Sequence, residues 1–181
     1  SGWQWRIPLQ TRVGNGLVYC SEFMSDDEAR DTLLRNIEGE VITEPRVLRF
    51  RTGQRVQHWN RNCVALGLAA GFLEPLESTS IHLIQRGVIR LMQMFPYGGV
   101  VESDRTEFNR QMDTEFRTIR DFIIMHYHVT ERTDSEFWRR CRDMDVPDSL
   151  RHRLDLFRDT GRVFEAEGDI FRENSWTQVM L

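Results

Sequence analysis

The order of hydrophobic and polar residues predicts strands near the start of the chain and helices in the remainder. Large residues alternate along residues 3–9, which predicts a strand. Residues 11–13 and 17–20 are predicted to pair as a hairpin around the Gly-Asn-Gly sequence at 14–16, because Asn-Gly is typical of two-residue hairpin turns.

Two further strands and a first helix are expected before residue 60. Hydrophobic and basic residues alternate over residues 43–51 and return over 55–59, and this period of two predicts strands. Between the hairpin and these strands, residues 25–37 carry helical spacing. Ser25 and Glu28 form the capping-box pattern there, which predicts the start of that helix.

Four later segments repeat their apolar residues at the spacing of one helix face. These are residues 80–95, about 103–126, the stretch around 137–141, and 147–158, where Pro147 suits a first helical position. In the first of them the apolar stripe consists of Ile81, Ile84, Val88, Leu91, Met92 and Phe95. We expect the last twenty residues to form a loop and a short apolar segment.

These elements indicate the α+β class, because strands and helices fall in separate parts of the chain. Residues 1–79 are expected to form part of a sheet domain that ends in a turn before the first long helix. Residues 80–181 are expected to form a mainly helical subdomain.

Composition excludes several function classes. Hydrophobic residues at 40% and charged residues at 29% are typical of a soluble globular protein. No apolar run reaches the eighteen or so residues that a membrane helix needs, so no membrane association is expected. The chain opens without a signal-peptide pattern, which indicates the cytoplasm. A net charge of −4 disfavours broad nucleic-acid binding.

The sequence predicts no metal site. Cys20, Cys63 and Cys141 are odd in number and widely spaced, which indicates reduced thiols. His126 and His128 stand two residues apart, and on a helix such side chains diverge by about 200°. We interpret these histidines as structural or solvent-facing.

Residues 67–80 carry the candidate chemistry. Their glycine and alanine residues let a flat ligand approach the backbone, and Pro75 stiffens the turn that follows. The helix expected from Ser80 offers unpaired backbone N–H groups and a positive dipole end, which suit an anion. Glu77 stands beside those donors as a candidate proton-transfer group; the alternative is that it caps the helix.

Two motifs resemble the flavin-dependent tryptophan halogenase family. Trp3-Gln4-Trp5-Arg6-Ile7-Pro8 matches its Trp-x-Trp-x-Ile-Pro signature, and the Leu-Glu-Pro-Leu-Glu-Ser-Thr sequence at 73–79 is similar to its segment beside flavin and halide. The resemblance covers nearly the whole chain and implies a flavoprotein monooxygenase-like FAD and substrate domain. It also implies reduced FAD supplied by a separate flavin reductase, oxygen, a halide ion and a small aromatic, indole-like substrate.

The resemblance further implies roles for individual residues. Glu77 matches the family's active-site glutamate, and the backbone amides of Thr79 and Ser80 match its halide site, where most members have glycine at the second position. By the same resemblance Leu68 and Ile81 contact FAD, with ordinary core packing expected for both side chains as well. Trp3 and Trp5 either line the region beside the flavin or belong to a core.

Some family features are missing. All 24 basic residues are arginine, so the family's catalytic lysine is absent, as is its Gly-x-Gly-x-x-Gly loop. We therefore expect the chain to be the C-terminal portion of a family member and inactive alone. No adjacent tyrosines appear, although members that act on free tryptophan carry such a pair, which disfavours free tryptophan as the substrate. A flavin-dependent aromatic monooxygenase or degenerate relative, a non-catalytic helical interaction module, and a homodimer all stay open.

Overall fold

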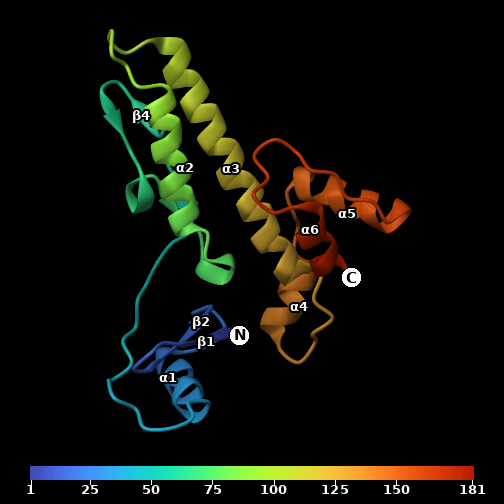
Figure 1. Cartoon of the computed structure of the whole chain (residues 1–181). Helices are drawn as coiled ribbons and strands as arrows, with labels where there is room; N and C mark the ends of the chain where they lie inside the picture. The colour runs from blue at the N-terminus through green and yellow to red at the C-terminus, as the bar shows by residue number, and fades with distance from the viewer. The chain divides into compact units, whose positions relative to one another are not determined.

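The computed structural model describes residues 1–181, and the chain divides into two compact units (Figure 1). The first unit consists of Ser1–Arg49 with Thr130–Met144, and the second of Phe50–Val129 with Asp145–Leu181. The domain boundary expected after residue 79 lies inside the second unit; as a statement about domains it stays a prediction. None of the helices combines the length and the apolar composition that a membrane span requires.

The first unit opens with an antiparallel hairpin of β1 (Gly2–Pro8) and β2 (Val13–Tyr19). The predicted turn at residues 14–16 is wrong, because the chain reverses where the N–H of Leu9 donates to the carbonyl of Arg12. Gly16 instead lies inside β2, opposite Trp5. A Cβ at Gly16 would stand 2.3 Å from the indole, so the glycine provides space for the ring and does not form a turn.

Two helices complete this unit. α1 (Asp26–Arg35) begins with the predicted capping box of Ser25 and Glu28, which is confirmed. α4 (Glu136–Asp143) is capped by Ser135. The predicted strand at 43–51 is wrong: these residues are irregular and no other strand pairs with them, so an alternating pattern alone did not produce a strand.

The second unit begins with short paired strands of two residues each. The predicted strand at 55–59 is wrong except at Trp59, because Trp59 is the only one of these residues that pairs with another strand. The elements are β3 (Gly53–Gln54) paired with β6 (Gly71–Phe72), β4 (Trp59–Asn60) paired with β5 (Cys63–Val64), and the 3-10 turns η1 (Gly67–Ala69) and η2 (Pro75–Glu77).

Helices α2 (Ser80–Gln93) and α3 (Glu102–His128) lie side by side and hold the core of this unit (Figure 1). The buried face of α2 consists of Leu83, Gly87 and Arg90. The predicted stripe from Ile81 to Phe95 is mostly exposed, and of its residues only Leu91 packs against the core cluster. The core cluster consists of Trp59, Ala70, Leu83, Phe108, Met112, Phe116, Ile119 and Ile123.

One carboxylate is fully buried between these two helices. Glu115 on α3 is 1% exposed and accepts a hydrogen bond from Nη1 of Arg90 on α2. Nε of Arg86 lies 3.3 Å and Nε2 of His82 lies 3.4 Å from its other oxygen. Gln111 accepts from Nε of Arg90, at 3.1 Å. This network fixes the position of α2 on α3.

The C-terminal helices pack on α3. α5 (Asp148–Thr160) follows Pro147 and ends at a left-handed Gly161, close to the prediction. Residues 162–172 form the expected loop, and α6 (Glu173–Met180) forms where only a short apolar segment was expected. Its Trp176 is completely buried against Phe122, at 4.8 Å between ring centroids. A single aromatic anchor of this kind leaves no periodic signal in the sequence, which explains why the helix was not predicted. The observed class is mixed α and β.

Candidate active site

The corner between η2 and α2 brings the predicted chemistry together. Pro75 starts the 3-10 turn, and the N–H of Ser78 closes it on the carbonyl of Pro75 at 3.0 Å. Ser78 is left-handed, with φ 54° and ψ 33°, which is uncommon for a residue with a side chain. Such strain is typical of functional corners. The reversal places Glu77 directly before the start of α2.

The backbone amides of Thr79 and Ser80 have no acceptor within the protein. Thr79 is the N-cap residue of α2, its side chain caps nothing, and its carbonyl accepts from the N–H of Leu83. No hydrogen bond from either amide to another protein group is present. Thr79 is buried and Ser80 half-buried. The start of α2 therefore presents unpaired N–H groups at the positive end of a fourteen-residue helix, an arrangement that favours an anion.

Glu77 is held on α3 and does not act as a helix cap. Its Oε1 lies 2.9 Å from Nε2 of His126, and the two side chains are 29% and 22% exposed. The alternative that Glu77 caps α2 is wrong, because its carboxylate contacts a histidine and no backbone amide. A carboxylate beside an imidazole, with part of its surface open, can exchange a proton.

Sequence reasoning missed His126. The side chain of His126 contacts the predicted acid, which is compatible with the structural role interpreted for it but is a contact that the sequence did not indicate. The two residues stand far apart in the sequence, so no spacing pattern connects them. Only the packing of η2 on α3 reveals the pair.

Leu68 and Ile81 are 78% and 79% exposed, so the expected core packing of their side chains is wrong. Leu68 belongs to η1 and Ile81 is the second residue of α2. η1 packs on α2 at Gly67, where a Cβ would meet Ile84 at 3.3 Å and where φ is +60°. Uncovered aliphatic side chains beside this close backbone contact leave a surface that a flat ligand can cover.

Trp3 and Trp5 belong to the first unit. Both are half-buried, and the ring of Trp5 lies across Gly14 and Gly16 of β2. Nε1 of Trp3 is buried without a hydrogen-bond partner. Their predicted place beside a flavin stays a prediction.

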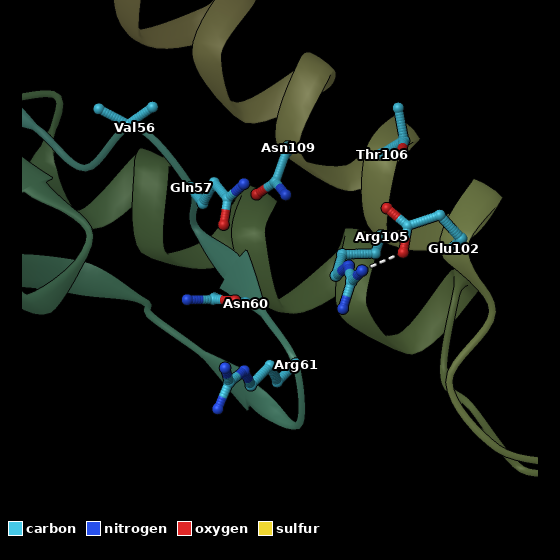
Figure 2. Close-up of a pocket in the computed structure, with 8 residues that line it drawn as sticks. All are labelled: Val56, Gln57, Asn60, Arg61, Glu102, Arg105, Thr106 and Asn109. Atoms are coloured by element: carbon cyan, nitrogen blue, oxygen red, sulfur yellow. Dashed lines mark hydrogen bonds and ion pairs between the residues drawn. The ribbon is translucent and has the colours of Figure 1, made fainter.

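A hollow of about 450 Å³ lies elsewhere in the second unit, between the β4–β5 hairpin and the first turns of α3 (Figure 2). The side chain of Asn109 bonds both the N–H and the carbonyl of Trp59 there, and Arg105 pairs with Glu102. None of the predicted site residues lines it. No histidine or cysteine lines this hollow, and its one carboxylate, Glu102, is paired.

Comparison with known proteins gives a consistent result. The family model described as tryptophan halogenase matches residues 1–181. Xcc4156, a flavin-dependent halogenase from Xanthomonas campestris, is 57% identical with a TM-score of 0.96 over 99% of this chain and 36% of its own. BrvH, a flavin-dependent halogenase from Brevundimonas sp. BAL3, is 47% identical with a TM-score of 0.95 over 98% of this chain and 36% of its own.

The tryptophan 7-halogenase KtzQ from Kutzneria is 38% identical over 87% of this chain and 30% of its own length. The chain thus spans about a third of the length of the relatives it matches. Over that third, both the sequence and the fold agree with these proteins. The chain belongs to the tryptophan halogenase family.

Proposed function

We propose that this chain forms the C-terminal part of an FAD-dependent halogenase that chlorinates or brominates a small aromatic, indole-like substrate. The observation that carries this proposal is that the backbone N–H groups of Thr79 and Ser80 have no acceptor in the protein and follow closely after Glu77 in the same corner. Relatives named as flavin-dependent halogenases and tryptophan halogenases support it.

Halide binds to the amides of Thr79 and Ser80. The helix start contributes about 0.3–1 kcal/mol to an anion at an exposed site and more at a sheltered one. Thr79 is buried, so the ion is partly shielded from water. The hydroxyl of Ser80 stands next to the same position as an additional donor.

The residues present fit a flavin. Leu68 and Ile81 offer uncovered aliphatic surface, and Gly67 allows close backbone packing at the same corner. When bound, reduced FAD, supplied by a separate reductase, provides the electrons with which oxygen and halide form hypohalous acid. Residues 1–79 form part of the FAD and substrate domain in this proposal.

Glu77 removes the ring proton of the substrate after halogen has added. The C–H bond breaks, its electron pair restores the aromatic ring, and the proton moves to a carboxylate oxygen of Glu77. A positioned carboxylate in this role contributes about 10²–10⁴-fold to the rate. The lysine found in the family's N-terminal half has no counterpart in these residues.

The test uses the full-length protein that contains this chain, with a flavin reductase, FAD and an indole substrate. We expect a product whose mass follows the halide, so that bromide in place of chloride changes the mass by the difference between the two halogens. Hydroxylated product alone, or product independent of halide, would contradict the proposal.

Two variants at one position test the anion site. Ser80→Asp places a negative charge at the first helical residue, where it suits the dipole but repels halide by about 1–4 kcal/mol. Ser80→Asn is the neutral control of similar size. We expect the half-saturating halide concentration to rise about tenfold or more for Asp and to stay within about threefold for Asn. Equal effects of the two variants would exclude halide from this position.

A further inference from the structure

The first unit contains two cysteines that come from distant parts of the sequence. Cys20 directly follows β2, and Cys141 lies on α4. Both side chains are half-buried, and neither is disulfide-bonded. The third cysteine of the chain, Cys63, is exposed and belongs to the second unit.

The turn that follows Cys20 packs on α4. The carbonyl of Cys20 accepts the N–H of Phe23 at 3.0 Å and that of Met24 at 3.1 Å, so the chain turns back tightly here. The ring of Phe23 meets the ring of Phe137 edge-on, with centroids 5.7 Å apart. Because Cys141 follows Phe137 by four residues on the helix, both lie on the face of α4 that receives this turn.

Charged groups add to the same contact. Arg140, the residue before Cys141, pairs with Glu22 at 3.0 Å, and its guanidinium carbon lies 5.6 Å from the centroid of the Phe23 ring. Burial raises the pKa of Cys141, and the neighbouring Cys20 raises it further against an opposing effect of Arg140. The two sulfur atoms are therefore near enough to sense each other's charge.

We propose that Cys20 and Cys141 are a redox-sensitive pair, which hydrogen peroxide converts to a disulfide between the end of the hairpin and α4. One thiolate attacks peroxide: an S–O bond forms, the O–O bond breaks and hydroxide leaves, which gives a sulfenic acid. The other thiolate attacks that sulfur, so the S–S bond forms and the S–O bond breaks with loss of a second hydroxide. The thiols together lose two electrons and two protons, and one peroxide becomes two molecules of water.

The disulfide connects parts of the unit that lie far apart along the chain. It joins the hairpin that carries Trp3 and Trp5 to the helix contributed by Thr130–Met144. In the unfolded chain the same bond closes a loop of about 120 residues, and long loops of this kind lose the most entropy on closure. Oxidation therefore fixes the hairpin on α4, and a thiol reductant releases it.

Peptide mapping of the full-length protein that contains this chain tests the pair. Trypsin cleaves after arginine and places the three cysteines in separate peptides, residues 13–30, 62–86 and 141–142. After brief exposure to hydrogen peroxide and alkylation of the remaining thiols, we expect peptides 13–30 and 141–142 to be joined, with a mass lower by two hydrogens than their sum. Cys63 should be recovered alkylated, and dithiothreitol should separate the joined peptides.

Single variants distinguish a pair from two unrelated thiols. In Cys20→Ser and Cys141→Ser a sulfenic acid has no partner thiol, so dimedone, which captures sulfenic acids, should label the remaining cysteine in at least one of them. In the unaltered protein the second thiol consumes the sulfenic acid, and we expect labelling at both positions to be about tenfold lower or less. Cys63→Ser is the matched control and should form the disulfide like the unaltered protein.

Three outcomes would overturn the proposal. Cys20 and Cys141 could stay reduced, oxidise separately to sulfinic acids, or bridge two copies of the protein, which a non-reducing gel detects. A disulfide forms only when the two Cα atoms come within about 7 Å, so each of these results would show that the fold does not bring them together. None of the measurements uses halogenation, so they decide on this pair whether or not the proposed function holds.

Discussion

Two carboxylates of the second unit, Glu115 on α3 and Glu77 against it, differ sharply in their surroundings. Glu115 is 1% exposed and lies against the guanidinium groups of Arg90 and Arg86 and the ring of His82. Glu77 has the single partner His126 and a side chain that is 29% exposed. The charge of Glu115 serves the fold, because protonating it would leave the buried guanidinium of Arg90 unpaired. A carboxylate with one basic partner and an open side is suited to exchange protons.

The largest effect that sharpens this comparison is expected at Glu115. Glu115→Ala leaves the buried guanidinium of Arg90 without its counter-charge, and breaking a buried pair in this way costs about 3–5 kcal/mol. We expect a loss of that size in the free energy of unfolding, measured by urea titration followed by circular dichroism.

Two controls accompany this variant. Glu107→Ala removes an exposed partner of Arg110 on the same helix and should lose only a small fraction of that stability. Arg90→Met combined with Glu115→Leu removes both buried charges and should recover most of the loss. If the double variant is as unstable as Glu115→Ala, the unpaired cation is not the cause.

An intermediate effect is expected from acid, through His58. This side chain is 1% exposed and stacks on Phe116. Burial lowers the pKa of His58 below its usual 6.5, and the charges of Arg55 and Arg90 lower it further against an opposing effect of Asp113. Because the unfolded chain takes up the proton first, stability is fully present above about pH 6.5 and is lost as the pH falls below it.

Unfolding midpoints in urea, compared above and below that pH, measure this loss. His58→Gln should flatten the dependence, whereas His152→Gln, at an exposed position of α5, should leave it unchanged. A dependence that survives in His58→Gln would assign the acid sensitivity to another group.

The smallest effect on stability is expected at Glu77, although its effect on activity is large. Glu77→Gln loses one partly exposed ion pair, and we expect the free energy of unfolding to change by less than about 1 kcal/mol. In the full-length enzyme, the same variant should lose about a hundredfold or more in turnover. A loss of stability as large as that of Glu115→Ala would show that Glu77 also serves the fold and would contradict the comparison.

The sequence predicted the elements that depend on local chemistry. The capping box at Ser25, the long period of α3 and the glycine stop at 161 each act within a few residues, and each was confirmed. The corner at Glu77 and Thr79 was also located from its motif, because helix starts and tight turns have local signatures.

The failures share a dependence on distant partners. Gly16 has the pattern of a turn, yet it accommodates the ring of Trp5 from the neighbouring strand. The apolar stripe of α2 around Ile84 and Val88 is exposed. Arg90 on the same helix is buried, where it pairs with Glu115. The contact of His126 with Glu77 exists only because η2 packs on α3. Hydrophobic periodicity records which residues are apolar, and it does not record what will cover them.

The packing of Trp5 on Gly16 has a consequence for anyone who varies this protein. Any side chain at position 16 would enter space that the indole already fills, with a first carbon only 2.3 Å from it. The two positions therefore have to change together: a larger residue at 16 fits only if the residue at 5 is smaller than tryptophan. Libraries that randomise Trp5 alone leave an empty groove over the glycine, so productive diversity at this hairpin requires both codons to change together.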